Sequence, residues 1–313
     1  MRDSSGLEIL RAMAVGDSLG LPFEGLRGRK NKTNWKQTFL AGWGITSDDT
    51  QHAAITYQAL RESHGVPEIF RACLGRRLAV WFLCLPPGIG FATLRACVKL
   101  CLGIRAPGSG VRSAGNGPAM RAPMIGWEVE EHMEELVQIS TLTTHTDPRA
   151  LTGARAVAWT MREFRQNPRV DKDALMELWR SLAPDDQEWQ MLLHAVRDAV
   201  SVDDLLARTE QKKGVGGYIY HTVPVCLYIV EKERGNFEAA VGAALCAGGD
   251  TDTTAAIVAA LSAAAGGTPP EEWLKILDMP TGTESFPRRL GFNLLALVVI
   301  LVWHVPKRLL TGR

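Results

Sequence analysis

The spacing of apolar residues is the feature that most limits how this chain can fold. Apolar side chains recur three or four positions apart in nearly every periodic segment, which is the period of a helix packed on one face. Runs of alternating β-branched residues between hairpin turns are almost absent. We therefore expect an all-α fold. Helices are predicted from Leu7 to Leu19, from Asp49 or Thr50 to Leu60, from Asp147-Pro148 through Met161, and over 174–182, 186–200, 202–208, 218–233, 237–246, 251–265 and 271–277.

The breaks between these segments are rich in glycine and proline and lie at 103–118, 213–217, 248–249 and 266–270. A chain of 313 residues allows one large domain or two modest ones, at roughly 100–200 residues per domain. None of the breaks is long or polar enough to be an inter-domain linker. Residues 1–313 are therefore predicted to form a single domain.

Two apolar stretches raise the question of a membrane span. The first, 78–103, is interrupted by Pro86 and Pro87, so we expect two short buried helices. The second, 290–305, has 16 residues, fewer than the ~20 that a spanning helix needs. We expect a buried C-terminal helix and no membrane span. The basic pairs on both flanks, Arg288-Arg289 and Lys307-Arg308, leave the membrane option open.

The overall charge gives little indication of a charged partner. Lys and Arg number 35 and Asp and Glu 34, so a net charge of +1 predicts no general affinity for nucleic acid or for an acidic membrane surface. The charges are unevenly spread, however. Residues 1–126 carry 16 basic and 8 acidic groups, whereas 127–210 carry 9 and 17. A basic first part favours an anionic small molecule, although charge segregation alone is a weak signal.

The cysteines and the N-terminus indicate a reducing compartment. Six cysteines are too few for a disulfide scaffold in a chain of this length, and none forms a CxxC pair. We expect reduced thiols buried among apolar neighbours. The first ten residues contain acids and no long apolar run, so they do not resemble a signal peptide, and we expect a cytoplasmic protein. The cysteines are Cys73, Cys84, Cys97, Cys101, Cys226 and Cys246.

The segment Gly248-Gly-Asp-Thr-Asp-Thr253 places two carboxylates between two alanine-rich helices. Such helices pack closely, and carboxylates buried between them are strongly desolvated unless they are paired or bind a metal. Alternatively, Asp250 caps the second helix and Asp252 adds favourable charge to its first turn. Spacing alone leaves both interpretations open.

The segment Ser47-Asp48-Asp49-Thr50 repeats this arrangement before another helix. Carboxylate and hydroxyl oxygens in short DD or DxD groups suit Mg²⁺ or Mn²⁺. One such cluster is a weak signal. Two that meet in space suggest a two-metal site, with ions roughly 3.5–4 Å apart.

A glycine-rich segment, Gly115-Asn116-Gly117-Pro118-Ala-Met120-Arg121, precedes a predicted helix start. Glycines there let a ligand approach backbone N–H groups at the helix N-terminus, which is a natural phosphate site. A plain tight turn is the commoner explanation of such a loop. The P-loop pattern GxxxxGK[ST] is absent, and no strand that would suit a Rossmann fold flanks the segment.

Single polar residues in apolar or small-residue surroundings complete the candidates. His145 lies just before a helix start and can hydrogen-bond a ligand, but a lone loop His is more often structural. Tyr218 and His221 are equally ambiguous. Asp17 lies inside the apolar first helix, where a carboxylate must hydrogen-bond the backbone or metal-bound water, and Glu24 follows one turn beyond that helix.

Taken together, these segments resemble the ADP-ribosylglycohydrolase family, whose members include the glycohydrolase that reactivates dinitrogen reductase and the (ADP-ribosyl)hydrolases of animals. The similarity covers residues about 12–265, and the combination of DDT and GGDTDT in this order is highly specific. The matching segments, in family order, are Gly16-Asp17-Ser-Leu-Gly20 with Glu24, Ser47 to Thr50, Gly115 to Arg121, Leu142 to His145, Gly217-Tyr218 with His221 to Pro224, and Gly248 to Thr253.

The resemblance implies a single compact domain of orthogonally packed helices with a binuclear magnesium centre, sometimes manganese, at the bottom of an ADP-ribose cleft. It also implies six metal ligands, Ser47, Asp48, Asp49, Asp250, Asp252 and Thr253. Family members often have Thr where this chain has Ser47, and either hydroxyl can ligate. Gly115, Asn116, Gly117 and Met120 would hold the distal ribose and phosphates, and His145 and Tyr218 would face the ligand.

The implied reaction is hydrolysis at C1″ of ADP-ribose attached to an acceptor, on a protein or a small molecule. Glu24, or a metal-ligating carboxylate such as Asp49, would assist proton transfer. Two alternatives remain, a catalytically weak member that only binds ADP-ribose or a related nucleotide, and a hydrolase of a free ADP-ribose ester. The sequence does not specify the acceptor, and we expect a monomer.

Overall fold

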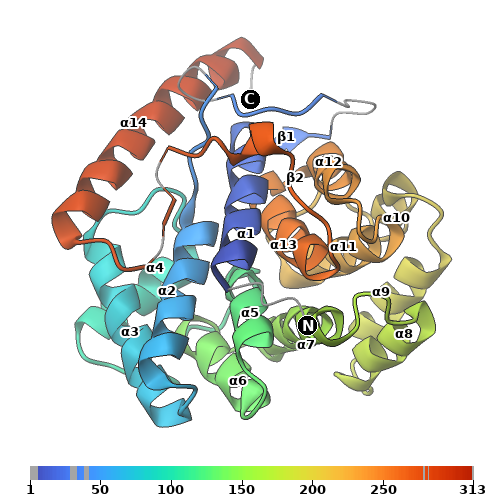
Figure 1. Cartoon of the computed structure of the whole chain (residues 1–313), viewed down its shortest axis with the longest axis horizontal. Helices are drawn as coiled ribbons and strands as arrows, with labels where there is room; N and C mark the ends of the chain where they lie inside the picture. Colours follow the sequence, from blue (N-terminus) through green and yellow to red (C-terminus); the bar gives the residue numbers. More distant parts are fainter. Residues whose placement is uncertain (1–5, 29–33, 39–41, 278, 281, 312–313) are drawn as a thin grey trace.

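The computed structural model describes residues 6–28, 34–38, 42–277, 279–280 and 282–311, and within them the fold is almost entirely helical, as predicted (Figure 1). The strands of the described residues are a two-residue antiparallel pair, β1 (Leu26–Arg27) and β2 (Gly248–Gly249). Two 3₁₀ turns, η1 (Leu21–Phe23) and η2 (Glu271–Leu274), accompany the helices. The α-helices are α1 (Gly6–Gly20), α2 (Asp48–Ser63), α3 (Pro67–Leu83), α4 (Phe91–Cys101), α5 (Gly117–Glu128), α6 (Met133–Thr144), α7 (Pro148–Gln166), α8 (Lys172–Ser181), α9 (Gln187–Asp198), α10 (Val202–Arg208), α11 (Ile219–Lys232), α12 (Phe237–Ala247), α13 (Thr251–Ala264) and α14 (Phe286–Thr311).

Helix starts follow the capping residues of the sequence. Asp147 accepts a hydrogen bond from Arg149 N and Pro148 begins α7, as predicted. The N-cap predicted for α2 was late by two or three residues, because Ser47 rather than Asp49 or Thr50 is the N-cap. The predicted helix over 271–277 is only the short 3₁₀ turn η2.

The closest helix pair joins the first helix to one late in the chain, at the centre of the molecule. α1 lies against α13, and Gly16 and Gly20 face the backbone of α13 so closely that an added Cβ would lie 2.1 Å from Ala255 O and 2.4 Å from Thr251 O. Almost every residue of α13 is buried, as its alanine-rich sequence predicted. This contact places the first turn of α13 beside the last turn of α1.

The two predictions of buried apolar helices were wrong in part. α3 and α4 form the expected helix pair, but Leu83 and Leu102 are exposed. α14 lies on the outside of the molecule and buries one face, including Ala296, while Leu294 and Val298 stay exposed (Figure 1). Side chains 301–311 lie outside the described set. Among the described residues, no helix is both long enough and apolar enough to cross a membrane.

The cysteines are free thiols in the described residues. Four are buried as predicted, whereas Cys101 is exposed and Cys246 is half-buried.

Candidate metal and ligand site

Three helix ends bring the predicted carboxylates together. Asp17 comes from the last turn of α1, Asp49 from the first turn of α2, and Asp252 from the first turn of α13. All three side chains are buried, and one carboxylate oxygen from each lies within 4.8 Å of the others. The two acidic motifs therefore meet in space, as expected, and Asp17 joins them.

Asp17 anchors the start of α2. Its carboxylate accepts hydrogen bonds from Ser47 N at 3.0 Å, from Thr50 N at 3.2 Å and from Thr50 Oγ1 at 2.5 Å. Burial raises the pKa of Asp17 to about 6, although these hydrogen bonds oppose the shift. The backbone bonding expected of a carboxylate inside an apolar helix is confirmed.

Asp49 is held by two hydroxyl groups and keeps one oxygen free. Ser47 Oγ donates to Asp49 Oδ2 at 3.0 Å, and Thr253 Oγ1 donates to the same oxygen at 3.1 Å. The other oxygen, Oδ1, is buried and has no hydrogen-bond partner among the described residues, and the same is true of Asp252 Oδ1. Burial and the neighbouring carboxylates raise the pKa of both groups well above the ordinary value.

Asp250 occupies the N-cap position of α13, but its side chain makes no capping hydrogen bond. Instead, Asp250 Oδ2 accepts from Asn116 Nδ2 at 2.7 Å, which ties the acidic cluster to the glycine-rich loop. The capping interpretation therefore fails for the side chain of Asp250. Asp48 is also buried, with a raised pKa caused first by burial and then by Asp17.

This donor set fits a hard divalent cation. Carboxylate and hydroxyl oxygens are the ligands that Mg²⁺ and Mn²⁺ prefer, and helix N-termini alone do not neutralise several clustered carboxylates. The two buried oxygens without partners, on Asp49 and Asp252, are the positions that cation coordination would satisfy.

A cleft of about 360 Å³ opens over these carboxylates. Its walls include Glu24 and Thr253 from the acidic side and Gly115, Gly117 and His145 from the opposite side. Of the predicted site residues, Ser47, which lies beneath Asp49, and Tyr218 do not line it. The predicted residues that do line it are Glu24, Asp48, Asp49, Gly115, Asn116, Gly117, Met120, His145, Asp250, Asp252 and Thr253.

Tyr218 lies next to the cleft residue Gly217, with its backbone paired to Gly115. Its hydroxyl donates to Glu188 at 2.7 Å, and its ring packs beside His221 and under the guanidinium of Arg149. The ring thus forms part of the cleft's surroundings, and its assignment to the ligand stays a prediction.

A buried cationic network fixes His145. Arg121 Nη2 donates to Thr144 Oγ1 at 2.7 Å, and Thr144 Oγ1 lies 2.8 Å from His145 Nδ1. A guanidinium can only donate, and His145 Nδ1 is the other partner of this hydroxyl among the described residues. The arrangement therefore favours the tautomer in which Nδ1 accepts the Thr144 proton. Burial, and secondarily Arg121, lower the pKa of His145 to about 3, so the ring is neutral and carries its proton on Nε2. Nε2 faces the cleft at Gly115.

Several cleft residues escaped the sequence analysis. Gly88, Gly90 and Phe91 line the cleft, although their segment was interpreted only as a break between helices. An added Cβ on Gly88 would lie 2.9 Å from Asp48 Oδ1, so this loop approaches the carboxylates directly. The double proline followed by two glycines was the available signal for a tightly folded loop.

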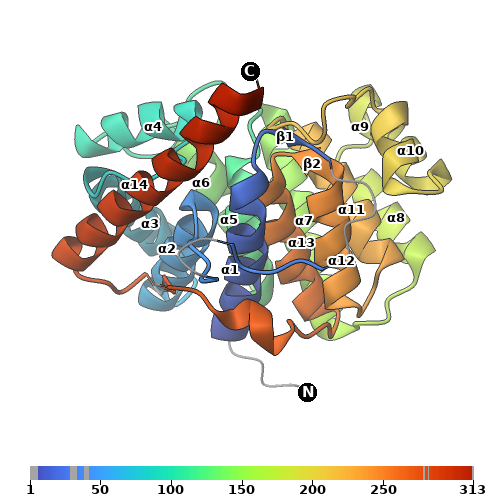
Figure 2. The same ribbon diagram turned by 90° about the horizontal axis from the view of Figure 1, so that it is seen from above.

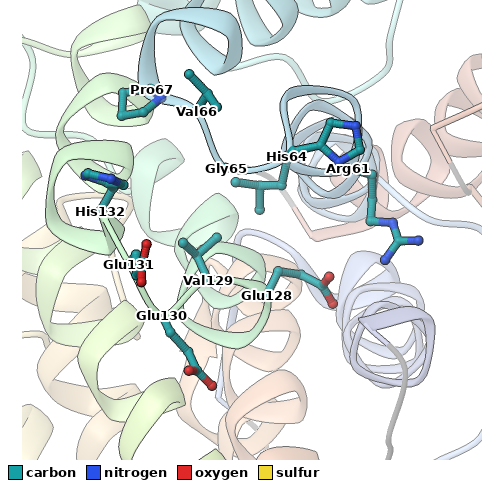
Figure 3. Close-up of a pocket in the computed structure, with 11 residues that line it drawn as sticks. Arg61, His64, Gly65, Val66, Pro67, Glu128, Val129, Glu130, Glu131 and His132 are labelled. Atoms are coloured by element: carbon teal, nitrogen blue, oxygen red, sulfur yellow. The ribbon is translucent and has the colours of Figure 1, made fainter.

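A larger cavity, of about 590 Å³, lies at the other end of α2 (Figure 3). Its charged side chains include Arg61, Glu128 and Glu130, and they are spread around the rim rather than directed at one point. The carboxylate cleft is therefore the better candidate for chemistry, despite its smaller volume.

An all-helical domain that collects carboxylates from α1, α2 and α13 beneath a glycine-rich ligand cleft defines the class of protein. Residues 4–298 match the family model described as ADP-ribosylglycohydrolase, and the chain belongs to the ADP-ribosylglycohydrolase family. A solved structure described as an ADP-ribosylglycohydrolase-related protein complex is similar, with a TM-score of 0.65 and 25% identity over 92% of this chain and 95% of that one. An uncharacterized protein of Archaeoglobus fulgidus is 30% identical over 281 residues, covering 84% of this chain and 88% of its own length.

Proposed function

We propose that this protein is a metal-dependent hydrolase that cleaves the glycosidic bond between ADP-ribose and a modified acceptor. The observation that carries the proposal is the pair of buried, unpartnered oxygens on Asp49 and Asp252 at the floor of the cleft. Family membership supports the hydrolytic class. The complete set of four Asp residues with Ser47 and Thr253 favours a catalytic protein over one that only binds ADP-ribose.

Ser47, Asp48, Asp49, Asp250, Asp252 and Thr253 would hold two Mg²⁺ ions, or Mn²⁺. When bound, such ions would supply Lewis acidity, which lowers the pKa of bound water, and would orient the diol of the distal ribose. Substrate binding, charge stabilisation and proton transfer fall to the protein's own groups.

The cleft residues suit the other parts of the substrate. His145 presents a neutral Nε2–H donor to a ligand oxygen. The N-terminus of α5, where Gly117 and Met120 line the cleft, offers the positive end of a helix to a phosphate. The carboxylates of the floor stabilise the positive charge that develops at C1″ as the glycosidic bond breaks. Glu24, exposed at the edge of the cleft, can exchange a proton with bulk water and with the reacting groups.

The test measures free ADP-ribose released from several acceptors. The protein is incubated with peptides ADP-ribosylated on Arg or Ser, with ADP-ribosylated guanine and with O-acetyl-ADP-ribose, each with Mg²⁺, with Mn²⁺ and with a chelator. We expect metal-dependent release from at least one glycosidic substrate. The variant Asp252→Ala should lose this release. Asp204→Ala is its matched control, because Asp204 also lies in the first turn of a helix, α10, but outside the cleft.

Release only from O-acetyl-ADP-ribose would show that the protein is an esterase and not a glycosidase. Binding of ADP-ribose without release from any of these substrates would indicate a binding protein. Equal activity with metal and with chelator would contradict the proposed metal dependence.

A further inference from the structure

Two segments far apart in the sequence lack acidic residues. Between Ile69 and Trp127 the chain has eight basic residues and no Asp or Glu. The sequence of α14 has four basic residues, two near each end, and also no acid. The first segment contains most of α3 and all of α4. The basic residues are Arg71, Arg76, Arg77, Arg95, Lys99, Arg105, Arg112 and Arg121 in the first segment and Arg288, Arg289, Lys307 and Arg308 in α14. Four of them pair with acids just outside these segments, Arg71 with Glu68, Arg76 and Arg77 with Glu62, and Arg289 with Glu284, and Arg121 is fully buried. The positive charge of the first segment that no described acid pairs with therefore comes from Arg95, Lys99, Arg105 and Arg112.

Both segments also expose aliphatic and aromatic side chains. On α4 and just beyond it, Phe91, Val98 and Leu102 are seven and four positions apart, so they form one stripe along the helix. Phe91 and Leu102 are each 74% exposed. The other large apolar side chains exposed on these elements are Ile69, Val80, Leu83, Leu85 and Ile104 on and around α3 and α4, and Phe286, Leu294, Leu295 and Val298 on α14.

The fold brings these two segments to the same end of the molecule (Figures 1 and 2). Asn293 Nδ2 of α14 donates to Cys84 O, directly after α3, at 2.9 Å. A groove of about 560 Å³ runs between α3 and α4, and its walls combine Val80 and Ile104 with the guanidinium-bearing Arg71 and Arg105. Apolar surface and positive charge are therefore interleaved on this end.

The opposite end has the opposite charge. Residues 171–210, which form α8, α9 and α10, carry ten acidic and four basic groups. In both views these helices lie across the molecule from α3, α4 and α14. The near-zero net charge of the chain thus hides a strong separation of charge between its two ends.

We propose that the end formed by α3, α4 and α14 binds the surface of a bilayer rich in anionic lipid. Exposed apolar side chains next to Lys and Arg are the combination that inserts at the headgroup boundary, where each basic residue near an anionic surface adds electrostatic attraction. The contact is interfacial rather than spanning, in agreement with the hydropathy of the described helices. A second copy of the chain fits this face less well, because symmetric pairing would bring like charges together.

This inference does not depend on the proposed function, because binding is measured without substrate. Phe91 belongs both to the exposed stripe and to the lining of the cleft, so membrane binding would place the edge of the cleft beside the bilayer.

The experiment is co-sedimentation of the full chain with vesicles at low ionic strength. We expect binding to vesicles of equimolar phosphatidylserine and phosphatidylcholine and little binding to phosphatidylcholine alone. Salt should weaken it, because the screening length falls from about 10 Å at 0.1 M to about 3 Å at 1 M. The double variant Val98→Ser/Leu102→Ser should bind about tenfold more weakly, because it loses two aliphatic groups from the contact.

The matched control is Met191→Ser/Val200→Ser, which removes two apolar side chains from the acidic end that are 71% and 76% exposed, against 42% for Val98 and 74% for Leu102. It should bind as the wild type does. Arg105→Glu should weaken binding, whereas Arg197→Glu at the acidic end should not. Circular dichroism melts establish that all four variants are folded.

Absence of binding to the anionic vesicles would overturn the proposal. So would an equal loss in the two double variants. Light scattering that shows a wild-type dimer broken by Val98→Ser/Leu102→Ser, without vesicle binding, would reassign the face to contact between copies.

Discussion

Two buried polar clusters meet at the cleft, and they reach stability in different ways. The guanidinium of Arg121 is fully buried, but it donates to Ser140 Oγ, Ser140 O, Thr144 Oγ1 and His52 Nδ1 at 2.7–3.2 Å. Burial lowers its pKa to about 10, so it stays charged at neutral pH. The carboxylates of Asp49 and Asp252 are also buried, yet each keeps an oxygen without a partner among the described residues. The chain thus satisfies its buried cation by itself, whereas we propose that an added cation satisfies its buried anions.

The largest expected effect comes from the anionic cluster. Asp252→Ala should abolish hydrolysis and metal binding while leaving the helical content nearly native. Because it removes one of several repelling carboxylates, the metal-free variant should be as stable as the wild type or more so. Wild type should gain stability with Mg²⁺, by about 2.7 kcal/mol at a hundredfold excess over Kd. Thermal melts with Mg²⁺ and with chelator, beside an ADP-ribose release assay, measure both effects.

If Asp252 only supported the start of α13, its loss would cost at most about 1 kcal/mol and would not respond to metal. Full activity in Asp252→Ala would contradict the metal assignment.

The cationic cluster should behave in the reverse manner. Arg121→Met leaves the two oxygens of Ser140 and the hydroxyl of Thr144 without their donors, so we expect a loss of about 3 kcal/mol of unfolding free energy. Mg²⁺ should not restore it. Urea unfolding at two Mg²⁺ concentrations makes the measurement, and Arg180→Met on α8 is the control outside the network. If Mg²⁺ restored the stability of Arg121→Met, the two clusters would not be independent, and the contrast drawn between them would be wrong.

The helix pattern and the acidic motifs were predictable from sequence because both are local. Asp147-Pro148 marks the start of α7, and the spacing of Asp250 and Asp252 marks one helix N-terminus. The Arg121 network was not predictable, since its partners come from α2 and α6, and nothing in the sequence near Arg121 indicates them. The exposure of α14 was missed for a related reason, because an apolar run does not reveal which of its faces finds a neighbour.

The third prediction concerns the pH dependence of the metal-free protein. Asp17 has a folded pKa of about 6 against 3.8 for the ordinary group, so between these values the folded state holds more protons than the unfolded state. Stability is therefore lost as the pH rises through this window, on the order of 2 kcal/mol between about pH 4 and about pH 7.

His145 contributes the opposite slope, because its pKa is lowered to about 3 from 6.5 and the unfolded state takes up the proton first. Melts across this range in chelator, compared between wild type, Asp17→Asn and His145→Gln, separate the two slopes. A wild-type slope unchanged in both variants would contradict these assignments.

The smallest expected effect tests the link between the clusters. Thr144→Val removes the hydroxyl that sets the proton of His145 on Nε2, so ADP-ribose affinity should fall about tenfold. Thr144→Ser should restore it. Thr143→Val is the matched control, because the Thr143 hydroxyl donates only to Ile139 O. Nitrogen-15 shifts of His145 report the tautomer directly. An unchanged tautomer in Thr144→Val would show that the Thr144 hydroxyl does not set the position of the His145 proton.

The contact between α1 and α13 has a consequence for folding during synthesis on the ribosome. Asp17 and Asp252 meet only because helices near opposite ends of the chain pack against each other. A nascent chain that has exposed Asp17 and Asp49 therefore still lacks Asp252, which follows some 200 residues later. Such non-local closure slows folding and lengthens the interval in which apolar segments are uncovered. Under the proposed function, metal binding would therefore wait until α13 has been synthesised.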